Sequence, residues 1–143
     1  VNQVVGSFTR IQTLDSLKLI RKVQAAAEKI NHPMAILLQV NAGNDPAKYG
    51  FKIEESAFAL DEILKSSHLL IEGLMTIAPY SPEDPSVARK CFDQLAELRQ
   101  SLQESHGVSL DELSMGMSDD LVHAIAAGST MIRVGSALFG SRK

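Results

Sequence analysis

The chain contains 143 residues, a length typical of a single domain of roughly 100–200 residues. Its composition, 45% hydrophobic and 22% charged, is that of a folded globular protein rather than a disordered one. The formal net charge of −3 argues against a broad surface for nucleic acid or anionic membranes. The single cysteine, Cys91, cannot form an internal disulfide, so we expect a reducing, cytoplasmic location.

The sequence shows no pattern of membrane insertion or secretion. No run of about 18 apolar residues occurs, so no transmembrane helix is predicted. No basic start is followed by an apolar stretch and a small-residue cleavage site, so no signal peptide is predicted. The chain begins at Val1 rather than at methionine, and we interpret this beginning as a sign that an upstream part is missing.

Short apolar segments alternate with amphipathic ones along the chain. A strand is predicted over 11–14 and a helix over 17–30, with Asp15 and Ser16 as candidate capping residues. The run 34–40 is apolar without alternation, as in a strand buried on both faces of a parallel sheet. The later predicted elements are a loop at 41–46, a helix over 53–65, a strand over 69–77, a loop at 78–82, a helix from 85 that stops at 106–107, a strand over 112–115, a helix over 118–127 and a strand over 130–134.

Strands that alternate with helices, without hairpin signals, indicate right-handed crossovers and a parallel sheet. Two α/β architectures are compatible with the five predicted strands: a doubly wound sheet and a (β/α)8 barrel. Because a complete barrel needs at least about 200 residues, a barrel formed by this chain would be incomplete. No linker or internal repeat is visible, so we expect residues 1–143 to form one domain.

A first candidate site follows the strand predicted at 112–115. Gly116 gives the chain freedom to turn, and Ser118 stands where the next helix is predicted to begin. Because the first amide groups of a helix have no partner within it, this end could hold a phosphate together with Ser114 or Ser118. The simpler interpretation is that Ser118 only caps the helix and that the two aspartates after it favour the helix dipole.

A second candidate site lies in the last predicted strand. Arg133 is costly to bury within an apolar strand unless it is paired or hydrogen-bonded. Sites gather at the carboxyl ends of parallel strands, so we expect Arg133 to face a ligand, with Gly135 and Ser136 offering amides and a hydroxyl. The alternative is a structural ion pair between Arg133 and an acidic residue. In (β/α)8 barrels the loops after the last two strands often form a phosphate site, which favours the ligand.

Other residues carry weaker signals. The four histidines lack the spacing of metal ligands, so no metal site is predicted. Asn41 ends the strand at 34–40 and is either a ligand contact or a turn residue, and Lys48 lies in the loop that follows. No lysine falls within a predicted buried strand, so a lysine that traps a carbonyl group is not apparent and no catalytic residue is predicted.

Two C-terminal motifs resemble one known family. They are LSMGMSDD at 113–120 and AAGSTMIRVGSALFG at 126–140. Together with QVN at 39–41, KYG at 48–50 and GLMTI at 73–77, they resemble the YggS and PROSC family of pyridoxal 5′-phosphate (PLP) homeostasis proteins. The resemblance covers nearly the whole chain, in order.

The resemblance implies a fold and a cofactor. The fold is a (β/α)8 barrel like the N-terminal domain of alanine racemase, and residues 1–143 would form its C-terminal part, about strands four to eight with their helices. The lysine that forms the Schiff base with PLP lies on the first strand of the family's barrel, which has no counterpart here. We therefore interpret the chain as an N-terminally truncated member and expect that lysine in the missing part.

The family is thought to bind and deliver PLP rather than to catalyse, which implies a non-enzymatic role in intracellular PLP homeostasis. By similarity, Arg133 faces the pyridine nitrogen, and a guanidinium, which only donates hydrogen bonds, keeps that nitrogen unprotonated. The phosphate would be held by Ser114 or Ser118 with Gly135 and Ser136. The full set of predicted cofactor-binding residues is Asn41, Ser114, Met117, Ser118, Arg133, Gly135 and Ser136.

Two other functions stay open at this point. One is a PLP-dependent amino-acid racemase or decarboxylase, which should show a second acid/base group such as a tyrosine, and Tyr49 and Tyr80 are the only tyrosines. The other is a phosphate-binding α/β domain without PLP. In the leading interpretation PLP is the ligand, PLP-dependent apoenzymes are candidate recipients, and neither nucleic acid nor membrane is a partner. The complete protein is expected to be a monomer.

Overall fold

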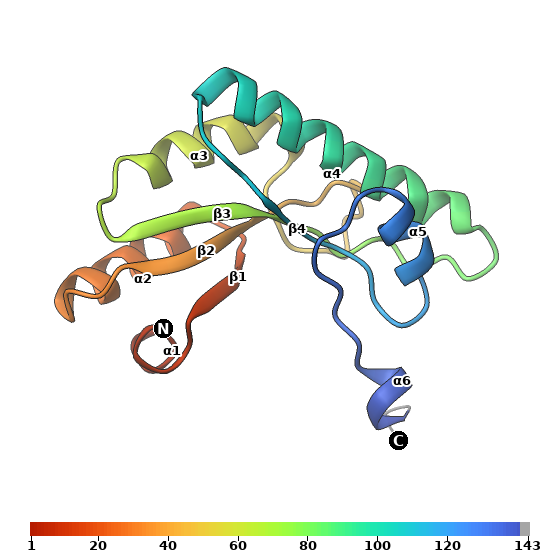
Figure 1. Ribbon diagram of the computed structural model, residues 1–143, viewed down its shortest axis with the longest axis horizontal. Helices are drawn as coiled ribbons and strands as arrows, with labels where there is room; N and C mark the ends of the chain where they lie inside the picture. The colour runs from red at the N-terminus through yellow and green to blue at the C-terminus, as the bar shows by residue number, and fades with distance from the viewer. Residues whose placement is uncertain (141–143) are drawn as a thin grey trace.

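A computed structural model describes residues 1–140, and Figure 1 shows how its elements are arranged. Strands and helices alternate, as the sequence predicts. Within residues 1–140, no helix combines the length and the apolar character that a bilayer crossing requires. The elements in chain order are α1 (Asn2–Ser7), β1 (Arg10–Leu14), α2 (Leu17–Lys29), β2 (Met34–Gln39), the 3₁₀ turn η1 (Ile53–Glu55), α3 (Ser56–Leu64), β3 (Leu69–Met75), α4 (Pro85–His106), β4 (Glu112–Ser114), α5 (Leu121–Ala126) and α6 (Ser136–Phe139).

The strands of the described region form one parallel sheet in the order β1-β2-β3-β4. Strand order therefore follows chain order without reversal. Helices α3 and α4 run along the same side of the sheet (Figure 1). A doubly wound sheet reverses its strand order and carries helices on both faces, so the doubly wound alternative is wrong for this chain.

One hydrophobic core lies between the helices and one face of the sheet. Met34, Ile36 and Leu38 of β2 belong to it, and Leu37, on the opposite face of the same strand, is also fully buried. Strand β2 is thus buried on both faces, as its unbroken apolar run predicts. The helical residues of the core include Ile20 and Val23 of α2, Leu60 and Ile63 of α3, and Phe92, Leu95 and Leu102 of α4.

The helix ends follow the capping signals of the sequence. At the start of α2, the Ser16 side chain accepts a hydrogen bond from the amide of Leu19 at 3.3 Å. At the start of α4, Asp84 accepts from the amide of Ser86 at 3.0 Å, and proline occupies the first helical position. Helix α4 ends at Gly107, whose φ of 64° is left-handed.

The strand predicted over 130–134 is reduced to a bridge between Ser114 and Met131. Strand β4 has only three residues, and Gly116, with a φ of 96°, turns the chain away from the sheet direction. Strand β4 therefore offers few backbone groups with which the segment after α5 could pair. The segment is still attached, because the amide of Arg133 donates to the carbonyl of Gly116 at 2.9 Å.

The helix predicted from residue 118 begins at Leu121. The Asp120 carboxylate accepts a hydrogen bond from the amide of Met117 at 2.7 Å and folds 117–120 into a turn. Ser118 is therefore in this turn and not at the helix start. Helix α1 has no counterpart among the predicted elements; it lacks a side-chain cap and buries Val5.

Thr76 directly follows β3 and is fully buried. Its hydroxyl donates to the carbonyl of Val40 at 2.7 Å and lies 3.8 Å from the sulfur of Cys91. Burial raises the pKa of the Cys91 thiol to about 11, although the hydrogen bond with Thr76 acts in the opposite direction. The thiol therefore stays protonated at neutral pH, and Thr76 is fixed against both β2 and α4.

Substitution of Gly73 should break the contact between β3 and β4. A Cβ atom at this position would lie 1.9 Å from the carbonyl oxygen of Glu112. We expect Gly73→Ala to lower the free energy of unfolding by about 1–3 kcal/mol or more, the range found for overpacked interiors. Urea unfolding measures the effect. Gly6→Ala is the matched control because nothing lies within 4 Å of a Cβ atom there; equal losses in the two variants would show that the close approach is not the cause.

The buried thiol should make stability depend on pH in the alkaline range. Below the ordinary pKa of 9.0, folded and unfolded chains both keep the proton of Cys91. Between that value and about 11, the unfolded chain loses the proton while the folded chain retains it, so stability falls as pH rises. We expect the free energy of unfolding, measured with urea, to fall more steeply between pH values of about 8 and 10.5 in the unmodified chain than in Cys91→Ala. Parallel curves would contradict the assignment.

Candidate functional site

Three segments meet at the carboxyl end of the sheet. Thr76 follows β3, Ser114 ends β4, and Arg133 lies in the segment that is bridged to β4 through Met131. Because parallel strands end on the same side of a sheet, side chains that are distant in the sequence converge there. Arg133 is the residue that connects all three segments.

The Arg133 guanidinium donates two hydrogen bonds to fixed acceptors. Its Nη1 group donates to the Ser114 hydroxyl at 2.6 Å, and Nη2 donates to the backbone carbonyl of Thr76 at 2.8 Å. Burial lowers the pKa of the Arg133 guanidinium, and the carboxylate of Asp120 opposes this shift. Because an arginine side chain does not lose its proton in a protein, the site carries a fixed positive charge.

The structural ion pair considered for Arg133 is not formed within residues 1–140. Its partners are a neutral hydroxyl and a neutral carbonyl. Of the five N–H bonds of a guanidinium, two are used in this way, which leaves three for another acceptor. The arrangement supports the interpretation in which Arg133 faces a ligand.

Ser114 is fully buried, and its hydroxyl both accepts and donates a hydrogen bond. It accepts from Arg133 and donates to the side-chain oxygen of Gln12 on β1 at 2.6 Å. A hydroxyl has one proton, and here that proton is already given to Gln12. Ser114 therefore supports Arg133 and has no donor left for a phosphate.

Ser118 lies beside the turn at Gly135 and Ser136. Its hydroxyl oxygen accepts a hydrogen bond from the amide of Ala137 at 3.2 Å. The two turns that the sequence singles out are thus in direct contact. Within residues 1–140, the amides of Gly135 and Ser136 donate no hydrogen bond, so this turn presents free N–H groups beside the Ser118 hydroxyl.

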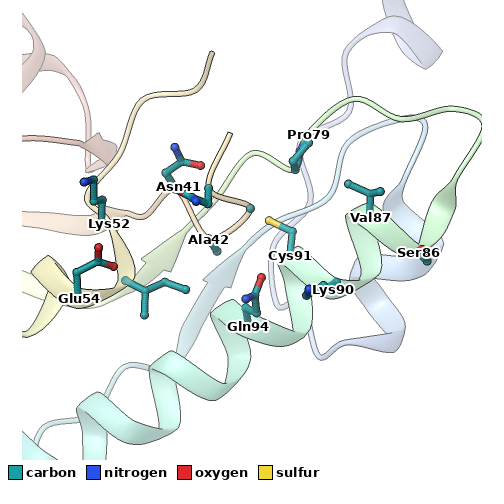
Figure 2. A pocket seen from close by; sticks show the side chains of 13 residues that line it. Asn41, Ala42, Lys52, Glu54, Pro79, Ser86, Val87, Lys90, Cys91 and Gln94 are labelled. Atoms are coloured by element: carbon teal, nitrogen blue, oxygen red, sulfur yellow. The ribbon is translucent and has the colours of Figure 1, made fainter. Parts of the chain in front are cut away.

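Asn41 serves the loop that follows β2. Its side-chain amide donates to the carbonyls of Asp45 and Lys48, at 2.8 and 3.3 Å, and its oxygen accepts from the amide of Asp45 at 3.0 Å. These bonds support the turn interpretation of Asn41. The loop borders a cavity of about 600 Å³ that Figure 2 shows between Asn41 and helix α4, on the helix side of the sheet.

Met117 forms no part of the group of hydrogen-bonded residues around Arg133. It is 43% exposed and lines a smaller cavity of about 290 Å³ together with Lys48, Tyr80 and His123. The structure thus brings together Ser114 with Arg133, and Ser118 with the turn at 135–136, whereas Asn41 and Met117 border separate cavities. Among residues 1–140, no cluster of three potential metal ligands occurs.

Gln12 is a member of this site that the sequence reasoning missed. It contacts Ser114 across the sheet, although β2 and β3 separate their strands. The only signal in the sequence is an uncharged polar residue in a short strand that also contains Arg10 and Thr13, which is a common pattern. Its partner is 102 positions away, so local spacing carries no information about the contact.

Comparisons with known proteins agree with the fold. The model of a family described as alanine racemase, N-terminal domain, matches residues 7–143. The pyridoxal phosphate homeostasis protein of Synechocystis sp. is 41% identical over 142 residues, which are 98% of this chain and 64% of that protein. The corresponding protein of Aquifex aeolicus is 38% identical over 143 residues, covering 100% of this chain and 62% of that protein.

A solved structure is similar along nearly the whole chain. PipY of Synechococcus elongatus PCC7942, with PLP bound, superimposes with a TM-score of 0.87 at 31% identity. The match covers 97% of this chain and 64% of PipY. The chain therefore spans about three fifths of the length of the relatives that it matches. The chain belongs to the alanine racemase N-terminal domain family, and its parallel sheet is part of a (β/α)8 barrel.

Proposed function

We propose that this chain provides the ring-nitrogen and phosphate contacts of a PLP-binding protein that acts in PLP homeostasis and does not catalyse a reaction. The observation that carries the proposal is the guanidinium of Arg133, held by two neutral acceptors with further N–H groups available. The similarity to proteins named for PLP homeostasis, and to PipY with PLP bound, supports the choice of ligand.

The residues present fit the two acceptor ends of PLP. The pyridine nitrogen accepts one hydrogen bond when unprotonated, and Arg133 offers donors only. The phosphate accepts several, and the free amides of Gly135 and Ser136 lie beside the Ser118 hydroxyl. Ser114 is occupied by Arg133 and Gln12, so we assign the phosphate contact to Ser118.

The same geometry argues for a non-catalytic role. When bound, PLP supplies an electron-withdrawing ring, which is most effective with its nitrogen protonated. Arg133 holds its charge and donates, so it does not deliver a proton to that nitrogen. Tyr49 and Tyr80 are 79% and 75% exposed, and Cys91 is a buried, protonated thiol. Within residues 1–140 neither tyrosine nor Cys91 forms a hydrogen bond with Arg133 itself, and the thiol contacts only the Thr76 hydroxyl, which disfavours the racemase or decarboxylase alternative.

Several points of the leading interpretation stay predictions. They are the delivery of PLP to dependent apoenzymes, the monomeric state of the complete protein, and the upstream position of the Schiff-base lysine. The contacts of Asn41 and Met117 with the cofactor also stay predictions. The hydrogen bonds of Asn41 within its loop support an indirect role for that residue, through the shape of the loop.

Replacement of Arg133 tests the proposal directly. In the protein as its complete gene encodes it, we expect Arg133→Gln to raise the dissociation constant of PLP about tenfold or more, because a hydrogen bond to a charged donor is lost. A PLP titration followed by absorbance gives the constant. Arg21→Gln, on the exposed surface of α2, is the control and should leave binding unchanged. A large drop in melting temperature with unaltered affinity in the folded fraction would instead assign Arg133 a structural role.

The 143-residue chain itself should not capture PLP covalently with normal stability. The lysines within residues 1–140 lie on helices and in loops, none in a strand of the sheet, and only Lys48 among them is half-buried. After mixing with PLP and reduction with borohydride, mass spectrometry should show no stoichiometric adduct on one residue. Such an adduct would contradict the expectation. Lys48 is the first position to examine, with Lys48→Arg as the matched variant, because it lines the cavity beside Met117.

A further inference from the structure

A chain of hydrogen bonds crosses the inner face of the sheet. Gln12 of β1 accepts from the Ser114 hydroxyl of β4 at 2.6 Å, and Ser114 accepts from Arg133 at 2.6 Å. In a flat sheet, strands three places apart are separated by about 14 Å, more than these side chains span. The sheet is therefore curved enough to bring its first and last strands within reach on this face. The proposed function gives Gln12 no role.

The direction of each bond in this chain is determined by chemistry. A guanidinium has no acceptor, so the Ser114 oxygen must accept from Arg133. The single hydroxyl proton of Ser114 then points to the Gln12 oxygen, which also fixes the orientation of the Gln12 amide. Without an acceptor at position 12, the proton of Ser114 would be free to rotate toward Arg133, where two donors would oppose each other.

We propose that Gln12 and Ser114 are positioning residues for Arg133. They hold the guanidinium so that it presents only N–H groups, at a fixed orientation, to a ligand acceptor. The proposal rests on the proposed function and extends it to specificity. The site selects a ring whose nitrogen is a bare acceptor over a ring that carries a hydrogen at this position.

The selectivity can be measured with PLP and with its 1-deaza analogue, in which a C–H group replaces the ring nitrogen. The ratio of the two dissociation constants reports the contact between Arg133 and the ring nitrogen. In the protein as its complete gene encodes it, we expect the analogue to bind about tenfold or more weakly than PLP. A loss of general stability weakens both ligands alike and leaves this ratio unchanged.

Two substitutions of Gln12 separate positioning from packing. Gln12→Met keeps the length of the side chain but removes the acceptor, so the ratio should fall toward one. Gln12→Glu keeps an acceptor oxygen for Ser114, so the ratio should stay near that of the unmodified protein. Ser114→Ala removes the hydroxyl that connects Gln12 with Arg133, so it should lower the ratio in the way Gln12→Met does. It provides the test if Gln12→Met does not fold.

The outcomes separate this proposal from the proposed function. If the unmodified protein does not bind PLP, the proposed function fails and the positioning role fails with it. If it binds both ligands equally, the contact between Arg133 and the ring nitrogen is absent, and the positioning role is overturned while PLP binding stands. If the unmodified protein discriminates and the acceptor-free variants discriminate equally well, the positioning role alone is overturned.

Discussion

A half-buried positive charge that has no carboxylate partner among residues 1–140 is the constraint around which this end of the molecule is arranged. Removing the Arg133 guanidinium from water is costly, and the structure compensates with fixed neutral acceptors. The Thr76 carbonyl is fixed in place because the Thr76 hydroxyl donates to the carbonyl of Val40, the residue after β2. The Ser114 oxygen is available because the hydroxyl proton is directed to Gln12. Each acceptor is thus held by a neighbouring element, and the charge is oriented without being neutralised.

This constraint assigns different tasks to residues of the same type. Ser114 and Ser118 are four positions apart in one motif, yet Ser114 faces the inside of the sheet and serves the arginine. Ser118 lies in the turn beyond Gly116 and contacts the segment that begins at Gly135. The glycine between them changes the direction of the chain and so separates the two tasks. The support of Arg133 and the proposed phosphate contact are therefore neighbours in sequence but distinct in space.

The sequence predicted what depends on local pattern. The unbroken apolar run of β2, the cap at Ser16 and the alternation of strands and helices are local signals, and all are confirmed. The failures have causes that the apolar pattern does not reveal. A carboxylate that folds back on Met117 shortens the start of α5, and the brevity of β4 leaves only one bridge at Met131. Gln12 could not be found because its importance arises from curvature that unites strands 102 positions apart.

The curvature itself has a mechanical consequence. Because the bond between Gln12 and Ser114 joins the first and last strands of the described sheet, it would stretch if the sheet flattened and relax if the sheet curled further. Ser114 also carries Arg133, so such a deformation would be transmitted to the tilt of a single guanidinium. The curvature of the sheet and the orientation of its buried charge are therefore coupled through the hydrogen bonds of Ser114.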